Sequence, residues 1–244
     1  MPSASPALSL VGVSKSFGDL AVLKNVDFSI EKGQSGAIIG PNGAGKTTLV
    51  NIISGVFRPN GGAIHLDGEN IVGFDPYQIA RKGLVRTYQI TSLFLDMTVR
   101  ENVEIALIAR RKYRRAASAK SAGVGELLDL IGLGDLDDRL VHELSHGDQR
   151  LLEVGVALAF NPEILLLDEP TAGMSPAETE RFINLVNAKL RGRCTMILIE
   201  HDMDVVMRTA DRVCVLAGGT VIAEDVPERI GQSQFVREAY LGHS

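Results

Sequence analysis

The chain has 244 residues, of which 45% are hydrophobic and 23% are charged, and its formal net charge is −5 at pH 7. A chain of this length and composition can bury a core without a disulfide or metal staple, and it is too apolar to be disordered. Because an acidic protein repels the phosphate backbone, we expect no nucleic-acid partner.

The first part of the chain predicts strands, then a loop and a helix. Alternating apolar residues over 8–30 indicate short strands, and the uninterrupted apolar run 37–39 indicates a strand covered on both faces. Apolar side chains within 49–53 share one helical face, and Gly55 ends that helix. A turn at residues 59–62 leads into another strand at 63–66.

The remainder alternates between helices and strands. Residues of about 90–160 form a mostly helical stretch, followed by a strand at 164–167, a helix of about Pro176–Leu190 and a strand at Thr195–Ile199. Residues 213–223 predict a hairpin that turns at two glycines. This order indicates an α/β core with a parallel sheet.

Secretion, membrane insertion and cysteine chemistry find no support in the sequence. Residues 1–6 have neither a charged start nor an apolar core, and no apolar run approaches the length of a spanning helix, so we expect a cytosolic protein. Cys194 and Cys214 lie in or beside apolar runs, where we expect buried small side chains rather than metal ligands or a disulfide.

A phosphate-binding loop is the first motif that carries chemistry. Residues 40–47, Gly-Pro-Asn-Gly-Ala-Gly-Lys-Thr, match the pattern G-x-x-x-x-G-K-[ST] between a predicted strand and a predicted helix. The glycines allow backbone N–H groups to surround phosphate oxygens, and the helix presents the positive end of its dipole. Lys46 is expected to reach the β- and γ-phosphates and Thr47 to hold Mg²⁺. The flanking elements argue against a chance glycine-rich turn.

An acidic pair follows a later strand. The run Ile164–Leu167 ends in Asp168 and Glu169, which places carboxylates at the edge of the sheet where ligands of open α/β folds bind. We expect Asp168 to act on the Mg²⁺ shell and Glu169 to polarise the attacking water, as phosphoryl transfer requires. Alone, such a pair is usually a solvated strand end; with the phosphate loop it indicates nucleotide hydrolysis.

A third motif resembles a known family. Residues 144–150, Leu-Ser-His-Gly-Asp-Gln-Arg, open a predicted helix before Asp168 and resemble the signature motif of ATP-binding-cassette (ABC) ATPases. Other positions keep the family order. Phe17 resembles the aromatic that stacks on adenine, Gln89 the glutamine that senses Mg²⁺ and joins the core to the helical insert, and His201 the switch histidine.

The resemblance implies one ABC domain over residues 8–242. It predicts a P-loop core with a parallel sheet and an N-terminal antiparallel β subdomain over about 8–88 and 161–242, and an inserted helical subdomain over about 89–160. The implied catalytic residues are Glu169, His201, Lys46 and Gln89, and the implied Mg²⁺ residues are Thr47, Gln89 and Asp168. The implied ATP-binding residues are Phe17, Gly40, Pro41, Asn42, Gly43, Ala44, Gly45, Lys46, Thr47, Thr48, Ser145 and Gly147.

The resemblance also implies partners. Two cassettes pair head to tail, and each ATP lies between the phosphate loop of one chain and the signature motif of the other. Closure drives membrane permease subunits, so we expect a peripheral protein on the cytoplasmic face of the membrane, served indirectly by a periplasmic or extracellular binding protein. The second cassette is the same chain or a paralogue, and we favour the heterodimer.

Local details narrow the subgroup. Residues 93–103, 172–176 and the ending Ala239–Gly242 resemble ATPases of branched-chain amino-acid importers, and also those of urea or amide importers and of lipopolysaccharide export. A soluble ABC ATPase of DNA repair or translation is an alternative, but those carry coiled-coil insertions or two cassettes. An interaction module with little turnover would not need Glu169 and His201, and a P-loop small-molecule kinase would not explain the signature motif.

Two sequence features depart from the common family pattern, and a basic cluster stands apart from it. His146 and Asp148 replace Gly and Gln of the common signature, and Ser175 stands where many members have Asp. We expect the Asp148 carboxylate to repel the partner's ATP, or else only to stabilise its own helix. The basic cluster 110–115 predicts a solvated helix end, or a contact with anionic lipid headgroups.

Overall fold

The computed structural model describes residues 5–87, 93–113 and 122–241, and it contains two β-sheets among them. The first sheet has the strand order β2-β1-β4-β5 and is antiparallel. Its strands are β1 (Leu8–Phe17), β2 (Leu20–Ile30), β4 (Gly61–Leu66) and β5 (Glu69–Asn70).

The second sheet carries the predicted motifs. Its order is β10-β9-β3-β8-β7-β6, and the strands from β9 to β6 pair in parallel, whereas β10 is antiparallel to β9. The strands are β3 (Ser35–Ile39), β6 (Leu84–Arg86), β7 (Ile164–Asp168), β8 (Thr195–Ile199), β9 (Arg212–Ala217) and β10 (Thr220–Asp225). The antiparallel pair β9–β10 is the hairpin that the glycine pair predicts.

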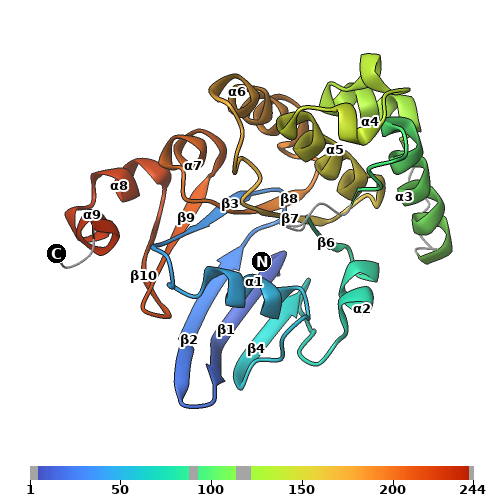
Figure 1. Cartoon of the computed structure of the whole chain (residues 1–244). Helices are drawn as coiled ribbons and strands as arrows, with labels where there is room; N and C mark the ends of the chain where they lie inside the picture. The colour runs from blue at the N-terminus through green and yellow to red at the C-terminus, as the bar shows by residue number, and fades with distance from the viewer. Residues whose placement is uncertain (1–4, 88–92, 114–121, 242–244) are drawn as a thin grey trace.

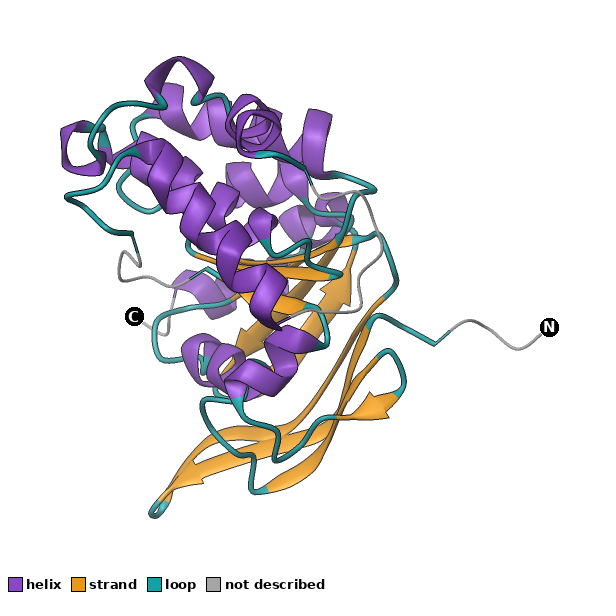
Figure 2. Cartoon of the chain, turned by 90° about the vertical axis from the view of Figure 1, so that its right-hand side faces the viewer, coloured by secondary structure: helices purple, strands orange, loops and turns teal. Residues whose placement is uncertain are grey.

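Helices cover both faces of this second sheet. On one face lie α3 (Val99–Tyr113), α4 (Val124–Ile131), α5 (His146–Ala159) and α6 (Pro176–Leu185), which gather together in Figure 1. On the other face lie the antiparallel sheet and α1 (Lys46–Ile53), with α2 (Pro76–Arg81) beside them. The C-terminal helices α7 (Met203–Thr209), α8 (Pro227–Gln232) and α9 (Gln234–Leu241) pack on the β9 end. Figure 2 shows most helices on one side of the strands.

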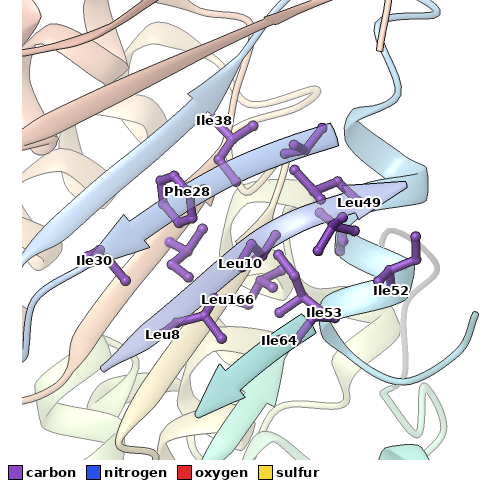
Figure 3. Packing of buried hydrophobic residues seen from close by; sticks show 14 of the residues in the cluster. Leu8, Leu10, Phe28, Ile30, Ile38, Leu49, Ile52, Ile53, Ile64 and Leu166 are labelled. Carbon is purple, nitrogen blue, oxygen red and sulfur yellow. The ribbon is translucent and has the colours of Figure 1, made fainter. Parts of the chain in front are cut away.

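The alternation of side chains along a strand explains why the central strands are apolar throughout. Ile164 and Leu166 of β7 join the core cluster shared with the antiparallel sheet and α1, shown in Figure 3, whereas Leu165 and Leu167 join the cluster under α3–α6. Successive side chains point to opposite faces, and both faces of this strand are covered. The predicted α/β class with a parallel sheet is therefore confirmed.

Boundaries differ from the expectations at two places. The strand predicted at 63–66 begins earlier, at Gly61, because the glycine pair 61–62 is drawn into the antiparallel ladder with β1. The helix predicted over 176–190 is α-helical to Leu185 and continues as the π-helical turn η3 (Val186–Leu190). Between α4 and α5 lie two short 3₁₀ turns, η1 (Gly134–Leu136) and η2 (Val141–Glu143).

The expectation that both cysteines are buried is confirmed. Cys194 and Cys214 are buried free thiols, and burial raises their pKa to about 11 and about 12. Within the described part of the chain, no helix combines the length and apolar character that crossing a membrane requires.

Candidate functional site

The phosphate loop has a backbone that requires glycine. Gly40 has φ of 155°, and a Cβ there would lie 2.0 Å from the Leu216 carbonyl oxygen; Gly45 has φ of 103°, and a Cβ there would lie 2.7 Å from Leu23 Cδ2. An L side chain at either position would be strained and would clash with its neighbours. The loop therefore lies tightly against β2 and β9.

The N-terminus of α1, directly after this loop, is suited to an anion. Its N-cap is Gly45, no side chain caps the helix, and its first turn contains no acidic residue. The first N–H groups of a helix have no intrahelical partner and lie at the positive end of the dipole. Such a helix start fits a phosphate group, so the residues present here fit the nucleotide that the motif predicts.

Lys46 lies among the groups that the sequence predicts for catalysis. Its Nζ donates to the carbonyl oxygens of Gly40 at 2.6 Å and Pro41 at 3.1 Å. Burial lowers the pKa of Lys46, while the nearby carboxylates of Glu169 and Asp168 act to raise it. The structure thus brings the predicted lysine and the predicted acidic pair together.

Strand order explains this convergence. β8 lies between β3 and β7, with Ile199 opposite both Ile38 and Asp168. Because these strands are parallel, their carboxyl ends meet at one edge of the sheet. The phosphate loop follows β3, the acidic pair ends β7, and His201 follows β8.

Asp168 has a buried partner that the sequence analysis missed. Its Oδ2 accepts a hydrogen bond from Arg86 Nη2 at 2.7 Å, and the two side chains are only 1% and 7% exposed. Arg86 Nη1 also donates to Asn51 Oδ1 at 2.7 Å, and to Ser54 Oγ at 3.2 Å, so it ties β6 to α1. Asp168 Oδ1 has no hydrogen bond with the described residues and can face a metal ion. The sequence signal for this partner was a single arginine, Arg86, directly after the apolar residues Leu84 and Val85.

Glu169 is held in a left-handed conformation. Its φ is 48°, its N–H donates to the Ile199 carbonyl at 2.9 Å, and its own carbonyl accepts from Ala172 N–H at 3.2 Å. A non-glycine residue in this region is uncommon, so the turn at the end of β7 is imposed by its surroundings. The turn sets the direction in which the Glu169 side chain leaves the sheet.

A buried glutamate joins this turn to His201. Glu200 is fully buried, and its Oε1 accepts from the N–H and the hydroxyl of Thr171 at 3.1 and 2.6 Å. Its Oε2 accepts from the backbone N–H of His201 at 3.2 Å. The His201 side chain itself is 61% exposed, so it is free to meet a ligand at this edge. Sequence reasoning missed Glu200; the available signal was an acidic residue directly after the apolar strand Thr195–Ile199.

Phe17 lies at the end of β1 with part of its surface in solvent. The side chain is 44% exposed, and its ring packs edge-on against Phe57 with centroids 5.5 Å apart. Lys15 Nζ lies 5.0 Å from the Phe17 ring centroid. An exposed aromatic surface of this kind is available for stacking. Gln89 lies outside the described residues.

The signature residues begin α5 but do not meet the phosphate loop. Ser145 is the N-cap of α5, and its Oγ accepts from Asp148 N–H at 3.1 Å. In the described chain, no hydrogen bond joins Ser145 or Gly147 to residues 40–48; both instead contact Glu178 of α6. One chain therefore does not unite the two halves of the predicted site.

Asp148 has two polar partners within its own chain. Asp148 Oδ1 pairs with Arg181 Nη1 at 2.8 Å, and its Oδ2 lies 2.9 Å from Ser145 Oγ. The Asp148 charge is therefore paired with α6, and its repulsion of the partner's ATP stays a prediction. His146 places its Nε2 3.1 Å from the Ala172 carbonyl oxygen, and so links α5 to the loop after Glu169.

Two cavities lie away from this edge. Their volumes are about 200 and 290 Å³, and both are lined by residues that precede β7 and β8, among them Pro162 and Cys194. Neither contains the predicted phosphate residues, because a phosphate loop is an open cradle. Arg110 lines the smaller cavity and is 6% exposed, so the expectation of a solvated helix end is wrong for this residue. Arg114 and Arg115 lie outside the described residues.

Comparisons with known proteins agree with this geometry. Residues 23–172 match the family model described as ABC transporter. The chain is 40% identical to the high-affinity branched-chain amino acid transport ATP-binding protein LivG of Escherichia coli K12, covering 98% of this chain and 99% of that protein. BraF of Pseudomonas aeruginosa, with the same description, is 38% identical over 98% and 99% of the two chains.

Solved structures show the same fold. An ATP-binding cassette of an ABC transporter, MJ1267 in its ADP conformation, superposes with a TM-score of 0.85 at 31% identity, covering 98% of this chain and 100% of that chain. The match spans both sheets and the helices between them. The chain therefore belongs to the ABC transporter family, as its ATP-binding, ATP-hydrolysing domain.

Proposed function

We propose that this chain is the ATPase subunit of an importer for branched-chain amino acids. The observation that carries the proposal is the meeting of phosphate loop, acidic pair and His201 at one sheet edge, in a chain 40% identical to LivG over nearly its full length. LivG and BraF are described as branched-chain amino acid transport ATP-binding proteins, which gives no support to a DNA-repair, translation or lipopolysaccharide-export role.

Each residue of the proposed ATP site has a separate role in binding or hydrolysis. The N-terminus of α1 and Lys46 bind the β- and γ-phosphates, and Phe17 stacks on adenine. Glu169 orients and polarises the attacking water, and His201 donates to the γ-phosphate as charge develops. Glu200 holds the backbones of both segments in register.

Mg²⁺ fits the donor set of the same edge. Thr47 is exposed, and Asp168 Oδ1 accepts no hydrogen bond from the described residues. Together with Gln89, which lies outside the described residues, they would supply the oxygen ligands that Mg²⁺ prefers. When bound, the ion neutralises charge on the phosphate oxygens. Arg86 holds Asp168 Oδ2, which would leave Oδ1 for the ion.

The distance between the signature motif and the phosphate loop within one chain implies a second cassette as a partner. Ser145 and Gly147 reach a γ-phosphate only on a second cassette, so the working unit is a head-to-tail pair, and we favour a heterodimer. An importer ATPase acts on membrane permease subunits, which places this chain at the cytoplasmic face of the membrane. A periplasmic or extracellular binding protein delivers the substrate to the permease and does not contact this chain.

A transport assay tests the proposal. The chain is co-expressed with its permease subunits and partner cassette, purified, and reconstituted in proteoliposomes with the binding protein. Leucine uptake should require ATP and should be abolished by Lys46→Ala. Lys32→Ala is the matched control, because Lys32 is an exposed lysine paired with Asp67, away from the site, and should leave uptake unchanged. Uptake that persists in Lys46→Ala, or ATPase activity with no leucine uptake, would contradict the proposal.

A further inference from the structure

Glu178 of α6 binds both donors of the signature motif. Its Oε1 lies 2.7 Å from Ser145 Oγ and accepts from Gly147 N–H at 3.1 Å. The Ser145 hydroxyl has a single proton, and Glu178 is the closer of its two acidic neighbours, the other being Asp148 at 2.9 Å. One carboxylate oxygen of Glu178 therefore accepts hydrogen bonds from both the hydroxyl and the amide at the start of α5.

The approach depends on the glycine of the motif. A Cβ at Gly147 would lie 2.4 Å from Glu178 Cδ and 2.5 Å from its Oε1. No side chain larger than hydrogen fits at position 147 while Glu178 holds this place. Asp148 and Arg181 pair across the same two helices and keep α5 and α6 in this arrangement.

The second oxygen of Glu178 is also bound. Oε2 accepts from the Ser175 N–H at 2.8 Å and from the Ser175 hydroxyl at 2.8 Å, in the capping box that begins α6. These donors, with those of Ser145 and Gly147, lower the pKa of Glu178 to about 2. The group is thus an anion at neutral pH, seated at the positive end of a helix.

We infer that Glu178 occupies, within its own chain, the anion position that Ser145 and Gly147 offer to the γ-phosphate on the partner cassette, and must leave before that phosphate enters. The inference rests on the head-to-tail pairing of the proposed function. A carboxylate oxygen and a phosphate oxygen require the same two donors, and both are negatively charged, so they cannot share them. Glu178 is then a positioning residue that raises the ATP concentration needed for closure.

Glu178→Gln is the sharpest variant. Glutamine can still accept from Ser175, because a capping box accommodates Glu or Gln, so α6 keeps its N-terminus while the competing charge is lost. Glu180→Gln is the matched control: it removes the same charge from the same helix, and Glu180 binds Arg208 rather than the signature motif. Circular dichroism and thermal unfolding establish that both variants are folded.

An anion titration tests the competition on the full chain. The protein is labelled with ¹⁵N, its phosphate loop is saturated with ADP, and the Gly147 amide resonance is followed as inorganic phosphate is added. The half-saturating phosphate concentration for Gly147 should be at least fivefold lower in Glu178→Gln than in the wild type, and Glu180→Gln should match the wild type. An equal or higher concentration in Glu178→Gln, or no response of its Gly147 amide, overturns the inference.

A closure assay separates this inference from the proposed function. In a Glu169→Gln background, with the partner cassette present, sedimentation velocity measures the ATP concentration that gives half-maximal dimer. Glu178→Gln should lower it at least threefold; a purely structural role for Glu178 would raise it, and that result refutes competition. If Gly147 responds as expected but no chain dimerises with ATP, the competition is upheld and the cassette pairing of the proposed function fails.

Discussion

Replacing Arg86 by methionine tests how the carboxylate of Asp168, the proposed Mg²⁺ ligand, is held. The change keeps a long side chain but leaves the Asp168 carboxylate, 1% exposed, without the guanidinium that lies 2.7 Å away. Removing one partner of a buried ion pair costs about 3–5 kcal/mol, because the remaining charge stays buried without compensation. This is a large part of the 5–15 kcal/mol by which an ordinary domain is stable. The lost donors to Asn51 and Ser54 act in the same direction.

Urea unfolding without nucleotide measures the loss. With an m-value near 3 kcal/mol/M, the midpoint should fall by about 1 M or more. Arg208→Met is the control, because Arg208 pairs with Glu180 on the surface and such pairs contribute about 1 kcal/mol or less. The double variant Arg86→Met/Asp168→Asn should recover at least half of the loss, since the amide is uncharged. A loss below about 1 kcal/mol in Arg86→Met, or no recovery in the double variant, would refute the reasoning.

Further expectations concern turnover, docking and pH. Glu169→Gln should lower kcat by about 10²–10⁴ while leaving ATP affinity nearly unchanged, and wild-type kcat in a steady-state assay would contradict its role as base. His201→Ala should lower kcat by about 10²–10³ through a lost contact to the γ-phosphate, which single-turnover hydrolysis would detect. A photo-cross-linker at exposed Phe94 should reach a permease subunit, whereas one at equally exposed Val11 should not; products confined to the cassette would count against the transport role. Because the folded-state pKa of Glu178 is lowered from 4.5 to about 2, its contribution to the free energy of unfolding is present above about pH 5 and lost as pH falls toward 2. The stability difference between wild type and Glu178→Gln should shrink over that range, and a constant difference in urea titrations would contradict this.

Local patterns predict much of this protein because the chemistry of phosphate binding is local. The loop at residues 40–47 needs glycines, a lysine and a helix start in one continuous segment, so a short sequence motif is enough to identify this loop. The apolar run 37–39 before this loop likewise predicts a strand covered on both faces. The parallel sheet follows from the order of these elements, and the structure confirms it.

Other features depend on residues that are distant in sequence. Arg86 meets Asp168 because β6 pairs with β7, and Glu200 meets Thr171 because β8 brings its end beside the turn after β7. The local sequence around each of these residues does not identify its partner. A buried acid or arginine becomes recognisable only when the partner that compensates its charge is known.

The signature motif shows the division most clearly. The local sequence predicts that Ser145 and Gly147 open a helix, because an N-cap serine is a local feature. It also contained the capping box from Ser175 to Glu178, which explains how α6 begins. That these two helix starts face each other follows from tertiary packing alone. The packing between α5 and α6 sets where the Glu178 carboxylate lies, so the capping acid of α6 is also the anion that the start of α5 binds.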